Sequence, residues 1–240
     1  MICIIPARFS STRLKGKLLI PIQNKPLIQW TIENAIKMNL FSKVIVATDH
    51  EEIASIARKC NAIPIMTSES CSNGTERIHE AMETRPDLFD DSLIFNLQGD
   101  HPFVAKETIL AIAKLFKKDP TLLMGTAVFP MEGEKNFKNP NYVKCVFDKD
   151  QNAIYFSRSP IPHQKETCHF HYHIGIYAYT QSFLKTYKKM PQTPLQKLED
   201  LEQLKVIENG YKLKVAIVED LPLGVDVEED LNKIEKYLCP

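Results

Sequence analysis

Short hydrophobic runs alternate along most of the chain with longer stretches in which apolar positions recur at helical spacing. Runs that are short, apolar and bounded by polar or turn residues are typical of strands buried in a parallel sheet. Strands that alternate with amphipathic helices build an α/β fold around a mostly parallel sheet, so α/β is the predicted fold class. The expected core strands cover residues 1–6, 43–49, 62–67, 92–100 and 122–129.

Capping-box signals mark two helix starts that lie directly after strand ends. Asp49 precedes Glu52 by three positions, and Asn73 precedes Glu76 by the same spacing. In a capping box, the first side chain accepts a hydrogen bond from the backbone of the third helical residue. The expected helices cover residues 53–60, 78–84, 196–208 and 227–238.

The rhythm changes at residues 136–180, where short strand-like runs replace the helical stretches. We expect a β-rich, antiparallel insertion there. The strands expected within it are residues 142–147, 153–157 and 171–179, the first two on either side of a turn at 148–152. A last strand at 212–218 precedes the closing helix. A chain of this length can bury one sizeable core, so residues 1–240 are expected to form a single domain.

The charge balance excludes a global electrostatic attraction to nucleic acid or to an anionic membrane. Thirty Lys and Arg residues stand against thirty Asp and Glu residues, which gives a formal net charge of zero. Any polyanion must therefore be bound locally. The apolar start of the chain, residues 1–6, is too short for a signal peptide or a membrane span. We expect a cytoplasmic protein with no nucleic-acid and no membrane partner.

Six cysteines are scattered through the chain without a C-x-x-C spacing. In a chain of this size, the pattern argues against a disulfide scaffold and against a zinc knuckle. We expect reduced thiols with structural roles. They are Cys3, Cys60, Cys71, Cys145, Cys168 and Cys239.

The loop after the first strand, residues 6–17, is the most informative of the segments that follow strand ends. Ligands of an open parallel sheet bind beyond the carboxyl ends of its strands. This loop is dense in hydroxyls and cations, and Arg and Lys side chains bind phosphate oxygens. It lacks the Walker G-x-x-x-x-G-K-[ST] pattern, and a solvated surface loop is the alternative interpretation. The loop is therefore a candidate triphosphate site.

Asp100 follows a buried strand in the segment NLQGDHP, with Gly99 beside it. Mg²⁺ is usually held by one or two carboxylates together with substrate phosphates, so Asp100 is a candidate magnesium ligand. The alternative is an Asp-x-Pro turn that only ends the strand. Asp226, in the loop after the last strand, is the candidate for the partner carboxylate, but it also forms a D-x-x-E capping box with Glu229. The spacing alone favours the cap.

Three histidines alternate along one predicted strand, which places their imidazoles on one face. They are His169, His171 and His173. By ligand type the trio is a possible nickel or zinc site. The sequence indicates neither a fourth ligand nor the groups that orient such ligands, so exposed histidines on a flap are the favoured interpretation. Of the three, only His173 is placed for contact with a substrate.

Eight segments of the chain, in order and spacing, resemble the 3-deoxy-manno-octulosonate cytidylyltransferases, also called CMP-Kdo synthetases. They are IIPARFSSTRLKGK at 4–17, VATD at 46–49, NGTER at 73–77, NLQGD at 96–100, AIYFSR at 153–158, HIGIY at 173–177, LEDLEQL at 198–204 and GVD at 224–226. The resemblance covers nearly the whole chain, and the combination is more specific than any single motif. The chain departs from the family pattern with Lys15 in place of Pro, His101 in place of Glu and Lys205 in place of Arg.

The resemblance implies a nucleotidyltransferase-type (Rossmann-like) fold, a three-layer sandwich whose β-rich excursion serves dimerisation. It implies transfer of CMP from CTP to the anomeric hydroxyl of 3-deoxy-D-manno-octulosonate for lipopolysaccharide synthesis, with release of pyrophosphate. Mg²⁺ is the implied cofactor, CTP and the octulosonate are the implied substrates, and a homodimer is the implied assembly. The alternatives are a cytidylyltransferase for another sugar acid, of the 8-amino-Kdo or sialic-acid type, and a CTP-binding protein without turnover. A dinucleotide-binding oxidoreductase is disfavoured, because no G-x-G-x-x-G turn follows the first strand.

The functional residues of the family match positions of this chain, motif by motif. The implied catalytic residues are Arg8, Lys17, Asp100 and Asp226, of which Asp100 and Asp226 bind the metal ion. The implied nucleotide-binding residues are Pro6, Ala7, Arg8, Ser11, Arg13, Lys17, Gly74, Thr75, Arg77 and Gln98. Of these, Arg8, Arg13 and Lys17 surround the triphosphate, and Gly74, Thr75 and Arg77 lie beside the cytosine and ribose. The implied sugar-binding residues are Arg158, His173, Tyr177, Glu202 and Gln203.

Overall fold

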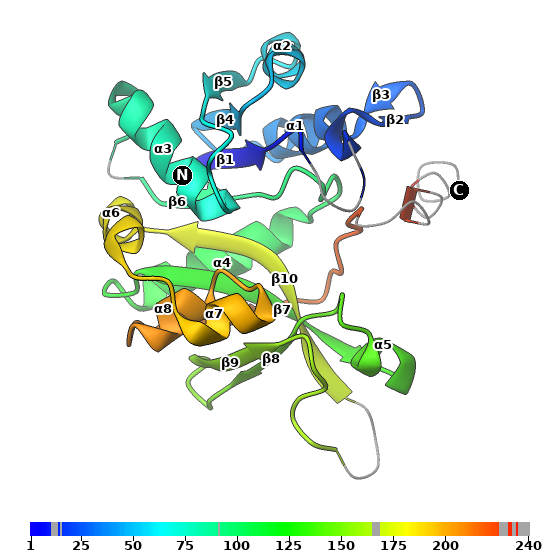
Figure 1. Ribbon diagram of the computed structural model, residues 1–240, viewed down its shortest axis with the longest axis vertical. Helices are drawn as coiled ribbons and strands as arrows, with labels where there is room; N and C mark the ends of the chain where they lie inside the picture. The colour runs from blue at the N-terminus through cyan, green and yellow to red at the C-terminus, as the bar shows by residue number, and fades with distance from the viewer. Residues whose placement is uncertain are drawn as a thin grey trace. The chain divides into compact units, whose positions relative to one another are not determined.

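The protein is described by a computed structural model over residues 1–10, 14, 16–90, 92–164, 169–225, 230–231 and 234 (Figure 1). The chain divides into two compact units. Unit 1 comprises residues 1–105 and 222–240, and unit 2 comprises residues 106–221. The expectation that residues 1–240 act as one domain stays a prediction.

The sheet of unit 1 is parallel, with the strand order β6-β1-β4-β5. Its strands are β1 (Ile2–Ala7), β4 (Lys43–Thr48), β5 (Ile63–Met66) and β6 (Ile94–Asn96). The four runs predicted as strands in this part of the chain are confirmed as parallel strands. Their apolar side chains form the core, and Ile2, Ile4 and Ile5 of β1 are fully buried. Burial on both faces explains why the runs are continuously hydrophobic rather than alternating.

The strand that precedes Asp100 is shorter than predicted. β6 ends at Asn96, whereas residues 92–100 were expected to be extended. The backbone N–H of His101 donates to the carbonyl oxygen of Gln98 at 3.1 Å, which closes a turn over residues 98–101. Asp100 therefore lies in a turn beyond the sheet edge, where a side chain can reach into a loop site.

Helices and short elements connect the strands of unit 1. They are η1 (Lys17–Leu19), β2 (Pro21–Ile22), β3 (Lys25–Pro26), α1 (Leu27–Lys37), α2 (Glu51–Lys59), α3 (Gly74–Thr84) and η2 (Pro86–Leu88). The capping prediction at Asn73 is confirmed, because its side chain accepts a hydrogen bond from the Glu76 N–H at 2.9 Å. The capping prediction at Asp49 is wrong: α2 begins after His50, which makes no side-chain cap. The Asp49 carboxylate is instead bound by Phe9 and Arg77.

Replacing Asn73 with Ala should destabilise the protein by about 1 kcal/mol, because the Glu76 N–H at the start of α3 loses its acceptor. Asn73→Asp keeps an oxygen acceptor in the same place and should remain close to the wild type. The midpoint of urea unfolding measures both variants. Equal midpoints for the Ala and Asp variants would contradict the capping role.

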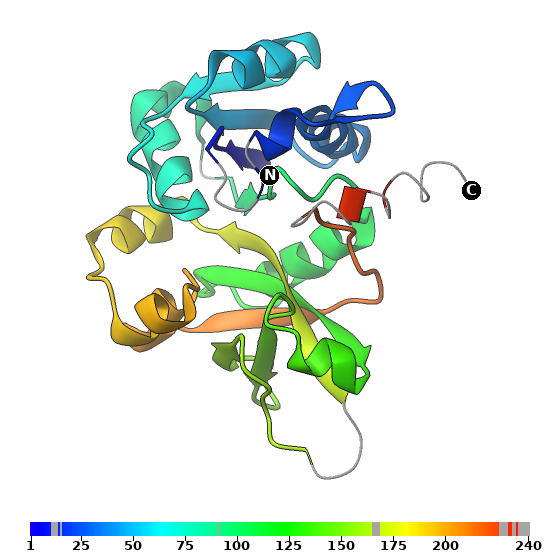
Figure 2. The same ribbon diagram turned by 45° about the vertical axis from the view of Figure 1, so that its right-hand side comes forward.

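The sheet of unit 2 is mostly antiparallel. Its strands are β7 (Met124–Glu132), β8 (Lys144–Phe147), β9 (Ala153–Ser157), β10 (His169–Tyr179) and β11 (Leu213–Ile217). Figure 2 shows β7 in green and β10 in yellow running side by side, and their register is antiparallel. β10 also pairs antiparallel with β8, and β8 with β9, which confirms the predicted antiparallel excursion. β11 runs parallel to its neighbour, β7.

Unit 2 also contains helices, of which α4 packs against β7 and β11. They are α4 (Lys106–Lys118), α5 (Glu134–Lys138), α6 (Gln181–Lys189), α7 (Pro194–Glu199) and α8 (Leu204–Glu208). The single helix predicted at 196–208 is wrong, because Asp200 adopts a left-handed conformation (φ 51°) that separates α7 from α8. The carboxylate of Glu208 accepts the N–H groups of Leu195 and Gln196 at 3.2 and 3.1 Å, which ties the end of α8 to the start of α7. The closing helix expected at 227–238 lies almost entirely outside the described residues.

Four of the six cysteines lie within the described residues, and all four are free thiols. Burial raises the pKa of Cys3 and of Cys145, which keeps these thiols neutral. The prediction of structural, reduced thiols is consistent with this placement. Cys168 and Cys239 lie outside the described residues. None of the helices in the described part of the chain combines the length and the apolar character that a membrane crossing requires.

Candidate active site

A buried lysine joins three segments of unit 1 that are distant in sequence. Lys17, at the start of η1, is 8% exposed. Its ammonium group forms an ion pair with the Asp100 carboxylate and donates to the carbonyl oxygen of Val225 at 2.7 Å. The N–H of Val225 in turn donates to the carbonyl oxygen of Asp100 at 3.0 Å. The predicted catalytic residues Lys17 and Asp100 are thus in direct contact, next to the segment that leads to Asp226.

The Asp100 carboxylate is held in its ionised form. Burial acts to raise its pKa, but hydrogen bonds and charges from His101 and Lys17 outweigh burial and hold the pKa well below its usual value. His101 approaches the second carboxylate oxygen at 2.9 Å. A Cβ atom on Gly224 would lie 3.0 Å from the His101 ring, so the absence of a side chain there lets the chain pass close to the imidazole. His101, which departs from the family pattern, therefore packs between Asp100 and the 224–225 backbone.

An ionised carboxylate beyond a strand end fits the half-site that Mg²⁺ prefers. Among the described residues, no group of three or more His, Cys, Asp or Glu side chains is arranged to hold a metal ion. The second predicted metal ligand, Asp226, lies outside the described residues, as does its capping partner Glu229. Its neighbour Val225 is hydrogen-bonded on both sides to the Lys17 and Asp100 pair. The donor chemistry therefore suits magnesium at Asp100, and the pairing with Asp226 stays a prediction.

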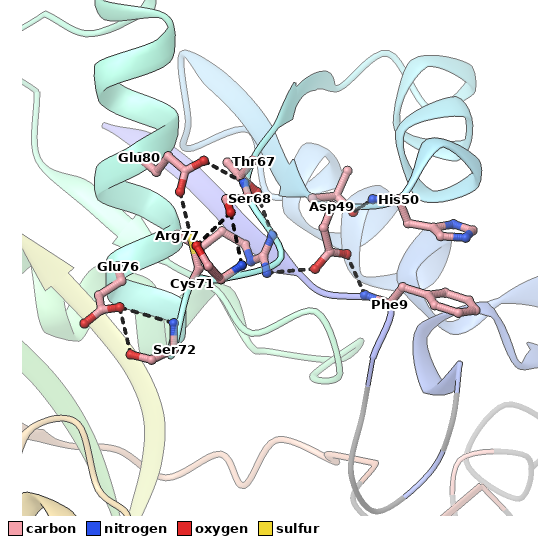
Figure 3. A network of polar contacts seen from close by, with 12 residues as sticks. Phe9, Asp49, His50, Thr67, Ser68, Cys71, Ser72, Glu76, Arg77 and Glu80 are labelled. Atoms are coloured by element: carbon pink, nitrogen blue, oxygen red, sulfur yellow. Dashed lines mark hydrogen bonds and ion pairs between the residues drawn. The ribbon is translucent and has the colours of Figure 1, made fainter.

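A second buried ion pair ties together three strand ends of unit 1 (Figure 3). Asp49 and Arg77 have side chains that are 6% and 3% exposed, and they meet at 2.8 Å. The other carboxylate oxygen of Asp49 accepts the N–H of Phe9 at 2.8 Å, just beyond β1. The other terminal nitrogen of Arg77 donates to the Thr67 hydroxyl at 2.6 Å, just beyond β5. The pair therefore fixes the point at which the cation-rich loop leaves the sheet.

Two further contacts steady the first residues of that loop and the segment before α3. The rings of Phe9 and His50 stack with centroids 4.0 Å apart. Glu80, on the next turn of α3 after Arg77, accepts the Ser68 N–H at 2.6 Å and the Cys71 thiol at 2.9 Å (Figure 3). Burial and the Glu80 carboxylate raise the pKa of Cys71 to about 11, so this thiol is not a nucleophile at neutral pH.

The start of α3 packs against the ends of β1 and β6. A Cβ atom on Gly74 would lie 3.2 Å from Pro6, 3.6 Å from Asn96 and 3.7 Å from Gln98. A residue with no side chain lets the start of the helix approach these strand ends closely. Three of the predicted nucleotide-binding residues, Pro6, Gly74 and Gln98, are therefore neighbours.

The remaining predicted nucleotide-binding residues differ in their accessibility. Arg8 is exposed, as expected for a group that meets a triphosphate. Ala7 in β1 and Thr75 in α3 are buried. Arg77 is buried and bound to Asp49 and Thr67, so its position is that of a group that holds the loop in place. Ser11 and Arg13 lie outside the described residues.

The predicted sugar-binding residues of unit 2 include a buried cluster around His173. One ring nitrogen of His173 lies 3.0 Å from the Thr126 hydroxyl, and the other lies 3.4 Å from the Gln203 amide nitrogen. The Tyr177 hydroxyl donates to the Gln203 amide oxygen at 3.0 Å. Burial, reinforced by the nearby Glu202 charge, raises the pKa of Tyr177 well above its ordinary value, so the phenol keeps its proton. The structure brings His173, Tyr177 and Gln203 together, with half-buried Glu202 next to Gln203 in the chain.

Arg158 directly follows the last residue of β9. Its guanidinium donates to the carbonyl oxygens of Glu199, Asp200 and Pro140 at 2.8, 3.2 and 3.3 Å. These carbonyls belong to the end of α7 and to the segment before β8. Arg158 therefore connects these two segments to the end of β9. Lys205, another departure from the family pattern, lies with its ammonium 4.3 Å from the ring centre of Tyr187. Binding of the sugar carboxylate by Arg158 stays a prediction.

The alternating histidines of β10 have separate environments. His169 is exposed and lies 2.9 Å from Glu132, whereas His171 packs edge-on against Phe147 with centroids 4.7 Å apart. His173 is buried in the cluster described above. The favoured interpretation of exposed histidines holds for His169 alone, because His171 is half-buried and His173 is buried.

The structure also identifies two residues to which the sequence gave no site role. Asp49 was interpreted as a helix cap, although its place at the end of a parallel strand is itself a signal for a ligand-binding edge. Thr126 lies inside an apolar run in β7 and carries no signal in the sequence. The role of each residue becomes visible only in the structure, because its hydrogen-bond partners are distant along the chain.

Comparison with known proteins agrees with this geometry. Residues 2–217 match the family model of the cytidylyltransferases. The chain is 44% identical to the 3-deoxy-manno-octulosonate cytidylyltransferase of Protochlamydia amoebophila, with 100% of this chain and 94% of the relative covered. It is 45% identical to the mitochondrial 3-deoxy-manno-octulosonate cytidylyltransferase of Arabidopsis thaliana, with 98% of this chain and 82% of the relative covered.

A solved structure of CMP:2-keto-3-deoxy-manno-octonic acid synthetase in complex with CTP superimposes with a TM-score of 0.90 at 32% sequence identity. The match covers 99% of this chain and 98% of that one. Sequence and fold thus agree over the full length, and the fold is the nucleotidyltransferase type that the motifs indicated. The chain belongs to the 3-deoxy-manno-octulosonate cytidylyltransferase family.

Proposed function

We propose that this protein transfers CMP from CTP to the anomeric hydroxyl of 3-deoxy-D-manno-octulosonate and releases pyrophosphate. The observation that carries the proposal is the contact between Lys17 and Asp100, which places a buried cation and an ionised carboxylate directly after the cation-rich loop. A triphosphate needs cations for its oxygens, and a hydroxyl nucleophile needs an anionic centre nearby that holds a metal ion.

The residues of unit 1 serve the nucleotide. Lys17 and Arg8, together with Arg13, neutralise the charge that grows on the departing pyrophosphate. The Asp49 and Arg77 pair holds the first residues of the loop, so these cations start from a fixed position. Fixed charges stabilise a transition state more than mobile ones, because no reorganisation is required when the reaction occurs.

Mg²⁺ is the proposed cofactor, with Asp100 and Asp226 as the residues that would hold it. When bound, the ion lowers the pKa of a coordinated hydroxyl and offsets phosphate charge. Lys17 and His101 keep Asp100 ionised, so the carboxylate is ready to accept a cation without first losing a proton.

The residues of unit 2 serve the sugar acid. Tyr177, Glu202 and Gln203 supply groups that bind hydroxyls, and Arg158 is the cation proposed for the carboxylate. Small changes in such a pocket alter the choice between related sugar acids, which keeps the 8-amino-Kdo and sialic-acid types as the alternatives to test.

The test is pyrophosphate release by the purified protein with CTP and Mg²⁺. 3-Deoxy-D-manno-octulosonate is compared with 8-amino-Kdo, with a sialic acid and with no sugar. Release that requires the octulosonate is the expected result. Release only with another acid would show that the other acid is the substrate. If no sugar acid led to release, the alternative of a CTP-binding protein without turnover would be favoured.

We further propose a cytoplasmic homodimer that forms through the β-rich part of unit 2. Two large apolar side chains of unit 2 are exposed, Ile154 on β9 at 58% and Leu198 on α7 at 82%. Ile154 belongs to the β-rich part, where a second copy of the chain would remove it from water. Light scattering should give a mass of twice 27.5 kDa, and a monomer mass at micromolar concentration would contradict the proposal.

A further inference from the structure

A carbonyl group fixes the direction of one hydrogen bond in the His173 cluster. The hydroxyl of Thr126 donates its only hydrogen to the carbonyl oxygen of Ile176 at 2.6 Å, because a carbonyl oxygen can only accept. The same hydroxyl oxygen lies 3.0 Å from Nε2 of His173. Since the hydroxyl hydrogen is already used, His173 must donate from Nε2. His173 therefore carries its hydrogen on Nε2.

This assignment determines the bonds that follow. In a neutral imidazole with a hydrogen on Nε2, Nδ1 has a lone pair and accepts. The Gln203 amide nitrogen, 3.4 Å away, is then the donor to Nδ1. The Gln203 amide oxygen must point the other way, where it accepts the hydroxyl hydrogen of Tyr177 at 3.0 Å. The hydrogen bonds thus run in one direction from Tyr177 to Ile176.

The backbone of β10 supplies the carbonyl that sets this direction. The antiparallel register between β10 and β7 is interrupted between His173 and Tyr177, where Gly175 has φ 78°. A residue without a Cβ atom adopts this conformation at little cost, and the resulting bulge directs the Ile176 carbonyl to the Thr126 side chain. Thr126 is fully buried, so water does not compete for either bond.

We propose that Thr126 is a positioning residue for the sugar acid: it holds His173 in the Nε2–H tautomer and so fixes the orientation of the Gln203 amide. This inference rests on the proposed function, which places Tyr177 and Gln203 beside the sugar. It assigns His173 a role through Gln203, because both imidazole nitrogens are used within the cluster. A fixed amide offers its second N–H, a donor, in one place, and a polyhydroxylated acid presents acceptor oxygens to such a donor.

The experiment compares Thr126→Val, which removes the hydroxyl and keeps the shape, with Thr126→Ser, which keeps the hydroxyl. Thr108→Val is the matched control, because Thr108 on α4 is also buried and its hydroxyl has no hydrogen-bond partner among the described residues. Thr126→Val should raise KM for the octulosonate roughly tenfold and leave KM for CTP unchanged. Thr126→Ser and Thr108→Val should keep both constants near the wild-type values.

The second measurement is the ¹⁵N NMR spectrum of histidine-labelled wild-type protein without substrate, with His173 assigned by comparison with His173→Gln. A hydrogen on Nε2 and a bare Nδ1 are expected. A hydrogen on Nδ1, or an unchanged sugar KM in a folded Thr126→Val variant, would overturn the inference. Absence of pyrophosphate release by the wild type would contradict the proposed function instead, and the NMR spectrum would then decide the role of Thr126 in the cluster.

Discussion

Replacing Asp100 with Asn should lower kcat for pyrophosphate release by at least about a hundredfold, because the carboxylate that faces Lys17 loses its charge. An amide is a weak ligand for Mg²⁺ compared with a carboxylate, and it leaves the buried ammonium of Lys17 without a full counter-charge. The loss should appear in kcat more than in KM for CTP, because Arg8, the proposed phosphate ligand, is unchanged. Initial rates at saturating CTP, Mg²⁺ and octulosonate measure it.

The matched control is Asp87→Asn, because Asp87 also pairs with a cation, Arg85 at 2.6 Å, but lies exposed on η2. That variant should retain its full rate, since exposed ion pairs contribute little. Thermal unfolding of both variants separates a lost reaction from a lost fold. A folded Asp100→Asn protein with a near-normal rate would refute the catalytic assignment of Asp100.

The elements that the sequence predicted well are those fixed by local pattern. β1 and β4 were recognised because short, continuous apolar runs such as residues 2–5, bounded by polar or turn residues, are typical of strands buried in a parallel sheet. The start of α3 was recognised because Asn73 and its acceptor role act within one helical turn. The binding role of the cation-rich loop, which was expected because strand ends are where an open sheet binds ligands, stays a prediction.

The elements that the sequence missed depend on partners distant along the chain. Asp49 has the spacing of a helix cap, yet a guanidinium 28 positions later binds its carboxylate. The break at Asp200 follows from Glu208, which holds the start of α7 against the end of α8. Thr126 is 47 positions from His173, and nothing within an apolar strand distinguishes it from a packing residue.

Asp49→Asn should destabilise the protein by about 3–5 kcal/mol, the range expected when one partner of a buried ion pair is removed. The amide still accepts the N–H of Phe9, so the variant removes the charge interaction and keeps the local shape. The Arg77 guanidinium stays buried and keeps its hydrogen bond to the Thr67 hydroxyl just beyond β5, but it loses its counter-charge. Urea unfolding measures the change in stability. KM for CTP should rise, because the start of the cation-rich loop at Phe9 is no longer connected to Arg77 through an ion pair.

The double variant Asp49→Asn with Arg77→Met tests whether the two residues act as a pair. Removing the second charge abolishes the cost of an unpaired buried cation, so the double variant should be more stable than Asp49→Asn alone. KM for CTP should nevertheless stay raised, because the anchor of Phe9 to α3 is still lost. Glu80→Gln is the control on the same helix, since the Glu80 carboxylate accepts hydrogen bonds from the 68–71 segment and the loss of its charge should cost about 1 kcal/mol or less. Stability losses that simply add in the double variant would show that Asp49 and Arg77 contribute independently, and the strand ends would then need another anchor.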